Sequence, residues 1–160
     1  MEESNIDEIK MEKQKTEKYY FSGIELVQSD PSFFIAIKGI KSIKAIQKFH
    51  FNISASSHIE FRIYENSEII EGNKLNIYNY DRNYENSNIV EAFYRPGIIN
   101  SGSLIFTLSR GKDGYENPTE FSNDWNKFTL KNDTYYLIEI SSKCKNNIVN
   151  YWFSWEEKVI

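Results

Sequence analysis

The stretch that decides the fold is FHFNISASSHIEFRIY, residues 49–64. It contains two runs in which large apolar side chains alternate with polar ones: Phe49, Phe51 and Ile53, then Ile59, Phe61 and Ile63. A period of two places successive side chains on opposite faces of a β-strand, so each run predicts a strand with one buried face. The Ser- and Asn-containing segment between the runs predicts a turn.

The same alternation recurs along the chain from Tyr19 onward. Turn-forming residues separate the runs, and no helical pattern of roughly 10–15 residues intervenes. We expect about nine strands, the further ones at 33–37, 75–80, 89–94, 103–108, 128–130, 134–141 and 148–155. Between 40 and 46, where Ile40, Ile43 and Ile46 are three apart, a helical turn is an alternative to a strand or bent strand. Many short strands without helices predict an all-β protein, an antiparallel β-sandwich with a jelly-roll-like topology.

One parity on these strands is expected to form the core, because a sandwich buries one face of each sheet. The expected core residues are Phe51, Ile59, Phe61, Ile63, Leu104, Phe106, Tyr136, Ile138 and Ile140.

The charge pattern divides the 160 residues into a short arm, 1–18, and a single β-sandwich domain, 19–160. The arm carries six acids and four lysines with almost no apolar side chains. Asn5 and Glu8 have the spacing of a helix N-terminus, and Ile6 with Ile9 forms one short apolar stripe. An isolated helix of this length is marginal, so two alternatives stay open: a solvated flexible terminus, or a short helix that docks on a partner through Ile6 and Ile9.

The composition argues against several classes of protein. Hydrophobic residues make up 40% and aromatic residues 16% of the chain, which predicts a folded protein. A net charge of −4 argues against a nucleic-acid partner. No apolar stretch reaches the roughly 18 residues of a membrane helix, and the N-terminus lacks signal-peptide features. We therefore expect no membrane partner and folding in the cytoplasm, where the single Cys144 stays reduced.

The residue types that carry catalysis or bind metals do not form a recognisable set. His50 and His58 lack zinc-site spacing, and no G-x-S-x-G motif accompanies them. The GKDG segment at 111–114 is read as an ordinary loop rather than half of a phosphate loop. Cys144 lies between two lysines, and an incidental exposed cysteine is favoured over a reactive thiolate. We expect no catalytic residue, no metal and no cofactor, hence a protein that is not an enzyme.

Four tyrosines are the candidates for contact with a partner. Tyr78, Tyr80, Tyr84 and Tyr94 lie in or beside an Asn-rich stretch. Tyrosine combines a large apolar ring with a polar tip, so such a surface suits stacking on sugars or a wet protein interface. The alternative is that these tyrosines are ordinary half-buried strand residues.

Several segments together resemble a family of small bacteriophage virion proteins. They are FNISASSHIEFRIYE at 51–65, NYDRN at 79–83, LIF at 104–106, a loop containing RGK at 110–112, WNKFTLKNDTYYLIEI at 125–140 and the ending WFSWEE at 152–157. The resemblance covers about two thirds of the chain, and its motifs are structural rather than catalytic.

The resemblance implies a capsid decoration or auxiliary subunit that binds and stabilises the assembled shell. Its partners would be the major capsid protein or other virion subunits, and its location the capsid surface after synthesis in the host bacterial cytoplasm. We also expect a homo-oligomer, since the arm and the aromatic residues both call for a partner surface. The alternative function is a glycan- or receptor-binding module of a head or tail fibre.

Overall fold

The fold is that of a computed structural model, which describes residues 16–84, 87–111, 119–122 and 128–159. Their backbone forms fourteen strands, and no part of these ranges is helical. In chain order the strands are β1 (Thr16–Val27), β2 (Phe33–Gly39), β3 (Lys44–Ala55), β4 (Ile59–Glu65), β5 (Glu68–Ile70), β6 (Asn73–Lys74), β7 (Tyr78–Asn79), β8 (Val90–Tyr94), β9 (Gly97–Asn100), β10 (Ser103–Arg110), β11 (Thr119–Ser122), β12 (Phe128–Leu130), β13 (Tyr135–Ser142) and β14 (Asn147–Val159). The predicted all-β class is confirmed, and these ranges include no helix that could cross a membrane.

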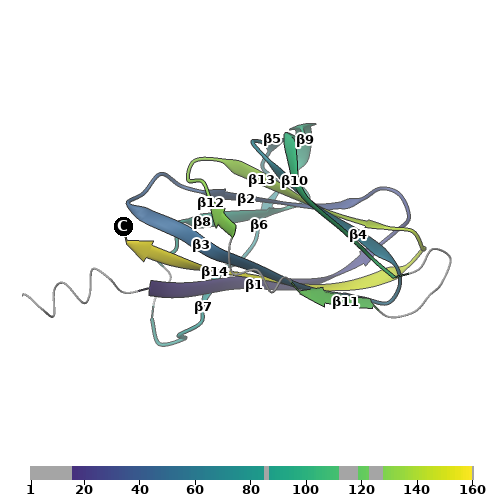
Figure 1. Cartoon of the computed structure of the whole chain (residues 1–160), viewed down its shortest axis with the longest axis horizontal. Helices are drawn as coiled ribbons and strands as arrows, with labels where there is room; N and C mark the ends of the chain where they lie inside the picture. Colours follow the sequence, from purple (N-terminus) through teal and green to yellow (C-terminus); the bar gives the residue numbers. More distant parts are fainter. Residues whose placement is uncertain (1–15, 85–86, 112–118, 123–127, 160) are drawn as a thin grey trace, which may run out of the picture.

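Two antiparallel sheets pack face to face (Figure 1). Sheet A has the order β11-β3-β14-β1-β7, with β12 also paired to β3, and sheet B has the order β10-β4-β13-β2-β8-β6. Strands β5 and β9 form a separate two-stranded ribbon, which lies above sheet B in Figure 1. The predicted antiparallel β-sandwich is therefore confirmed.

Consecutive strands lie on opposite sheets both in the first part of the chain, β1 to β4, and in its last part, β13 and β14. Strands β1 and β3 belong to sheet A, whereas β2 and β4 belong to sheet B. The last two strands then enter the middle of the sheets: β13 lies between β2 and β4, and β14 lies between β1 and β3. The register of β14 runs along all of β1, from Thr16 opposite Lys158 to Val27 opposite Asn147. Both sheets are thus held together by strands from opposite ends of the chain.

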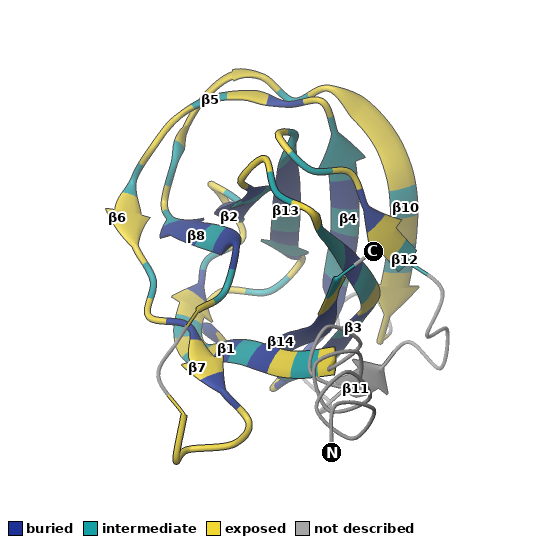
Figure 2. Ribbon diagram, turned by 90° about the vertical axis from the view of Figure 1, so that its left-hand side faces the viewer, coloured by how far each residue is buried: buried dark blue, intermediate teal, exposed yellow. Residues whose placement is uncertain are grey.

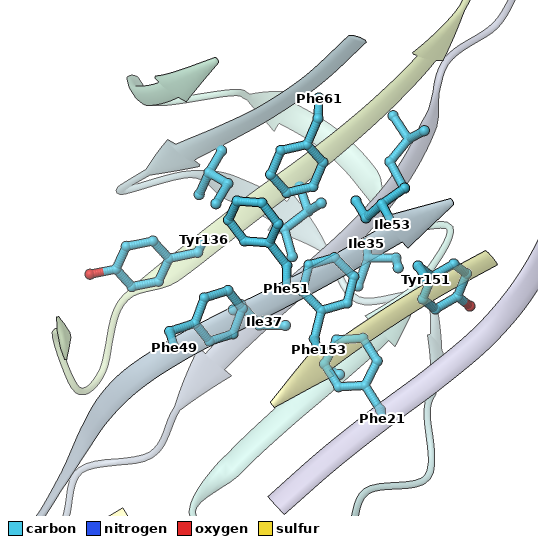
Figure 3. Packing of buried hydrophobic residues seen from close by; sticks show 14 of the residues in the cluster. Phe21, Ile35, Ile37, Phe49, Phe51, Ile53, Phe61, Tyr136, Tyr151 and Phe153 are labelled. Atoms are coloured by element: carbon cyan, nitrogen blue, oxygen red, sulfur yellow. The ribbon is translucent and has the colours of Figure 1, made fainter. Parts of the chain in front are cut away.

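Aromatic rings of inward parity fill the space between the sheets (Figure 3). Phe51 of β3 and Phe61 of β4 meet across the sandwich with ring centroids 4.6 Å apart. Phe153 of β14 lies 6.3 Å from Phe61 and 5.1 Å from Phe21 of β1. Each such ring removed from water contributes roughly 1.5–3 kcal/mol, which makes this cluster the main source of stability.

The core prediction is confirmed at all but one position. Phe106 packs against the core from β10, and seven other expected residues are buried: Phe51, Ile59, Phe61, Ile63, Tyr136, Ile138 and Ile140. Leu104 is the error, because its side chain is 51% exposed. The pairing of β10 with β4 shifts register between Leu104 and Phe106, and such a bulge changes the face to which a side chain points.

The expected single strand over 75–80 is wrong. Its neighbourhood holds two short strands on different sheets, since β6 pairs with β8 in sheet B and β7 pairs with β1 in sheet A. Between β2 and β3, Ile40 and Ile43 lie outside any strand and are 44% and 72% exposed, whereas Ile46 is buried in β3. The strand expected over 40–46 is therefore a turn followed by the start of β3.

The predicted arm boundary also shifts. Strand β1 begins at Thr16, so Thr16, Glu17 and Lys18 pair with β14 and belong to sheet A. Ile6 and Ile9 lie outside the described residues. Five strands are not among those expected. Strands β5, β6, β9 and β11 have only two to four residues, so their alternation is too short to recognise. Strand β1 has twelve residues, and although the alternation starts at Tyr19, no strand is among those expected there.

Candidate functional site

Four aromatic side chains gather on the outer face of sheet A. In the register of β1 and β14, Tyr20 and Trp152 are diagonal neighbours, and their rings stack with centroids 4.3 Å apart at an interplanar angle of 6°. Strand β7 brings Tyr78 to 5.6 Å from Tyr20, and Tyr80 packs edge-on at 5.2 Å from Tyr20. We call Tyr20, Tyr78, Tyr80 and Trp152 the aromatic cluster.

Backbone hydrogen bonds hold Tyr80 at the rim of this cluster. Its N–H donates to the carbonyl of Lys18 at 2.9 Å, which extends the pairing of β7 with β1. The buried Asn79 side chain accepts the N–H of Asp81 at 2.9 Å, so the chain turns immediately after Tyr80. Tyr80 is 47% exposed as a result.

The ring faces of the aromatic cluster are largely used within the protein. Tyr20 and Trp152 cover one face of each other, and the guanidinium of Arg82 lies over the ring of Tyr78 at 4.8 Å. Tyr80 contacts both Tyr20 and Trp152 edge-on. The cluster therefore offers ring edges and hydroxyl groups to a partner more than open ring faces.

A groove of about 300 Å³ borders the cluster beside Tyr80. We call it the lysine groove, and its walls include Lys18, Lys48, His50, Tyr80, Ser154 and Glu156. Strand β3 bulges here: His50 and Gln47, three residues apart, pair with Ser154 and Glu156, which are two residues apart on β14, and Lys48 of β3 has a positive φ of 51°. A bulge changes the face to which side chains point, and here Ile46 and Phe49, which are three residues apart on β3, are both buried in the core.

Glu156 is the centre of the lysine groove. Its side chain is 11% exposed, with Lys18 Nζ 3.7 Å from Oε1 and Lys48 Nζ 3.4 Å from Oε2. The lysine side chains themselves are 58% and 52% exposed. His50 Nδ1 is buried and has no hydrogen-bond partner within the described ranges.

The residue after Glu156 is a buried carboxylate, Glu157. Glu157 is 1% exposed and accepts hydrogen bonds from Trp155 Nε1 at 2.7 Å and from the Ile89 N–H at 2.8 Å. Burial raises the pKa of Glu157, while these two donors oppose the shift. The contacts fix the end of β14 against the segment before β8.

A second, shallower groove of about 450 Å³ lies on the other side of Trp152. We call it the amide groove, and its polar lining consists of Ser22, Asn52, Ser54 and Asn150. Beyond it the same face carries three exposed aliphatic side chains: Ile24, Leu26 and Ile148, which are 70%, 52% and 51% exposed. Charged, aromatic, amide and aliphatic zones thus follow one another along sheet A.

The structure brings together two of the four tyrosines predicted to contact a partner. Tyr78 and Tyr80 belong to the aromatic cluster, whereas Tyr84 lies exposed in the loop after β7. Tyr94 is on β8 in sheet B, where its half-buried ring packs 5.7 Å from Phe33. The other two candidates, Ile6 and Ile9, lie outside the described residues.

Sequence reasoning missed Tyr20 and Trp152. Tyr20 directly precedes the buried Phe21, and Trp152 directly precedes the buried Phe153. Adjacent residues point to opposite faces of a strand, so the sequence places an aromatic residue on both faces and does not indicate which one is exposed. The available signal was their outward parity relative to those phenylalanines, since β1 and β14 pair in unbroken register.

One histidine and serine pair lies outside sheet A. His58 Nε2 is 2.8 Å from Ser109 Oγ, and an added Cβ at Gly111 would lie 2.7 Å from His58 Cα. Acyl transfer also needs an oriented base and oxyanion donors, so a serine–histidine contact alone does not define an active site. Within the described ranges, no three His, Cys, Asp or Glu side chains form a metal-binding group.

Comparison of this chain with protein-family models, with curated proteins and with solved structures finds no match.

Proposed function

We propose that this chain is a non-enzymatic structural protein of a bacteriophage virion, a decoration or auxiliary subunit that binds the assembled capsid through the outer face of sheet A. The observation that carries the proposal is the aromatic cluster with its occupied ring faces, next to the exposed Ile24, Leu26 and Ile148. The bacteriophage origin of the partner comes from the resemblance of the sequence motifs.

A protein surface suits this face better than a sugar does. Sugar stacking needs open aromatic faces, and Tyr20 and Trp152 each lose one face to the stacking between them. Exposed aliphatic side chains add nothing to sugar recognition, but they gain free energy when a protein partner covers them, at roughly 25 cal/mol per Å². Tyrosine and tryptophan beside aliphatic residues is the composition of a protein interface core.

The path of the chain supports a jelly-roll topology. The order β11-β3-β14-β1 in sheet A faces β10-β4-β13-β2 in sheet B, with consecutive early strands on opposite sheets. Jelly rolls occur in capsid proteins and in lectins, so the topology fits both candidate functions and decides neither.

The proposed partners are the major capsid protein or other virion subunits, and the proposed location is the capsid surface after synthesis in the host cytoplasm. A homo-oligomer would engage several neighbouring capsid subunits at once. Simultaneous contacts raise the effective concentration, so modest affinity per contact gives tight retention.

A glycan- or receptor-binding module of a head or tail fibre is the second candidate. The amide groove favours it, because Asn52, Ser54 and Asn150 line a hollow beside Trp152. Amide and hydroxyl groups next to an indole are the contacts that sugar hydroxyls use.

Co-sedimentation with shells that lack this protein tests the proposal. The wild type should bind at a fixed stoichiometry, and Tyr78→Ala with Tyr80→Ala should weaken binding by about tenfold or more. Tyr135→Ala on sheet B is the matched control, since this tyrosine is half-buried and bonds Glu71 away from the aromatic cluster. Saturable binding to a glycan array without shell binding would refute the capsid role and support the fibre module.

A further inference from the structure

The lysine groove carries more positive than negative charge, although the whole chain has a net charge of −4. Its lining includes Lys18 and Lys48 but a single carboxylate, Glu156. The ion-pair network around Arg62 on sheet B is balanced instead: Arg62 contacts Glu60 and Glu139, and Lys143 contacts Glu60. The groove therefore has one positive charge in excess.

Both lysines keep donors for a further ligand. Charge-assisted N–H···O bonds are typically about 2.7–2.9 Å long, whereas these ammonium groups stand 3.7 Å and 3.4 Å from Glu156. Each ammonium has three N–H donors and is more than half exposed. Glu156 thus positions the two lysines on opposite sides of its own carboxylate without using up their donors.

Two further side chains in the groove can form hydrogen bonds. His50 and Ser154 are directly paired between β3 and β14, and both line the groove. The buried Nδ1 of His50 has no partner within the described ranges, whereas most buried polar atoms in proteins have one. A ligand oxygen seated between the lysines would lie in the groove that His50 and Ser154 line.

We propose that the lysine groove binds a carboxylate, supplied by an acidic side chain on the protein surface that the aromatic cluster covers. This inference rests on the proposed function and names the chemistry of the partner. Lys18 and Lys48 supply the charge, His50 and Ser154 complete the hydrogen bonds, and Tyr80 packs on the aliphatic part of the acid. A polyanion such as nucleic acid is not the ligand, because one excess charge is too little to hold it.

The first experiment uses a small probe. Titration of the labelled protein with N-acetylglutamate, followed by amide chemical shifts, should move resonances of Lys48, His50 and Ser154 saturably. The Lys18→Ala/Lys48→Ala double variant should lose this response, while Lys143→Ala should keep it. Lys143 is a matched control, with 48% exposure and an ion pair of 3.6 Å to Glu60. Absence of binding to the wild type would overturn the proposal, as would binding of N-acetylneuraminate in place of N-acetylglutamate.

The second experiment measures shell binding at several salt concentrations. The Lys18→Ala/Lys48→Ala variant should bind shells roughly five- to tenfold more weakly and with a shallower salt dependence, because the charge contacts are screened. Equal weakening by Lys143→Ala would overturn the groove as a specific site. If shells bind both variants like the wild type, the groove inference fails and the capsid role stands. If N-acetylglutamate binds but shells do not, the capsid role fails and the carboxylate site stands.

Discussion

The outer faces of the two sheets carry different kinds of side chains. On sheet B, Arg62 lies between Glu60 at 2.6 Å and Glu139 at 3.5 Å, and the Tyr64 hydroxyl donates to Glu139 at 3.0 Å. Here charged groups satisfy one another within the sheet. On sheet A the outer face carries aromatic, amide and aliphatic side chains, many of them exposed.

Among the described residues, a separate ribbon covers part of the outer face of sheet B, and no such ribbon covers the outer face of sheet A. Ile69 of the β5–β9 ribbon packs on a small second cluster formed by Ala36, Phe93 and Leu137, on the side of sheet B away from the core. Figure 2 shows strand β5 largely exposed at the top of the molecule and strands β8 and β13 largely buried or half-buried below it. A face that its own chain covers needs no partner, whereas an uncovered face with aliphatic and aromatic groups is a candidate interface.

The two outer faces differ as described only if the assigned side chains point into the core, and a core substitution, which has the largest expected effect, tests this assignment. Phe61→Ala should lower the free energy of unfolding by about 3–5 kcal/mol, because the ring is fully buried against Phe51. Leu104→Ala is the control and should change it by less than about 1 kcal/mol. Urea unfolding measures both. A loss below about 1 kcal/mol for Phe61→Ala would reverse the inner and outer faces of sheet B.

The second test concerns the internal network of sheet B. Arg62→Ala should cost about 1–2 kcal/mol of unfolding free energy, since it removes the cation beside the partly buried Glu139 and leaves Glu60 with the more distant Lys143. Lys48→Ala on sheet A should cost no more than about 0.5 kcal/mol, because that lysine is half exposed. Equal costs in urea unfolding would contradict the distinction between the two faces.

Tyr80→Ala should separate stability from binding. The ring is 47% exposed and makes only edge contacts with Tyr20 and Trp152, so the loss of stability should stay near 0.5–1 kcal/mol, roughly the value of an aromatic pair. Shell co-sedimentation should fall several-fold in the same variant. A stability loss above about 3 kcal/mol would make Tyr80 a core residue and remove it from the proposed interface.

The smallest expected effect is on the pH dependence of unfolding. The hydrogen bond from Arg62 lowers the pKa of Glu60 below its ordinary value of 4.5. A carboxyl group whose pKa is lower in the folded than in the unfolded state stabilises the protein at pH values above its unfolded-state pKa. This stabilisation is lost as the pH falls through the folded-state pKa. Glu60→Gln should therefore flatten the acid side of the stability curve.

Glu157 should change the free energy of unfolding with pH in the opposite direction. Burial raises its pKa above 4.5, so its favourable contribution is present below that pH and is lost as the pH rises through the folded value. Urea midpoints measured from about pH 3 to pH 7 separate the two carboxyl groups. A Glu60→Gln variant with a steeper acid limb than the wild type would show that Arg62 does not hold this carboxylate.

Alternation alone predicted the sandwich and most of its core, because the period of two reports directly on burial in long strands such as β3 and β4. It failed at Leu104, where a bulge interrupts the period. It also failed at Ile40 and Ile43, since isoleucine spacing carries no information about a turn between sheets. The aromatic cluster was half predicted, because Tyr20 and Trp152 join it through a pairing between strands from opposite ends of the chain.

The central position of β14 also governs how the protein is made. A ribosome delivers β1 and β3 long before β14, which pairs with both of them. Until β14 has been synthesised and has left the ribosome, these early strands expose open edges in sheet A, and such edges attract strands of other chains. Pairing over this sequence distance also slows folding. A nascent or prematurely terminated chain is therefore the form of this protein most exposed to aggregation and most dependent on chaperones.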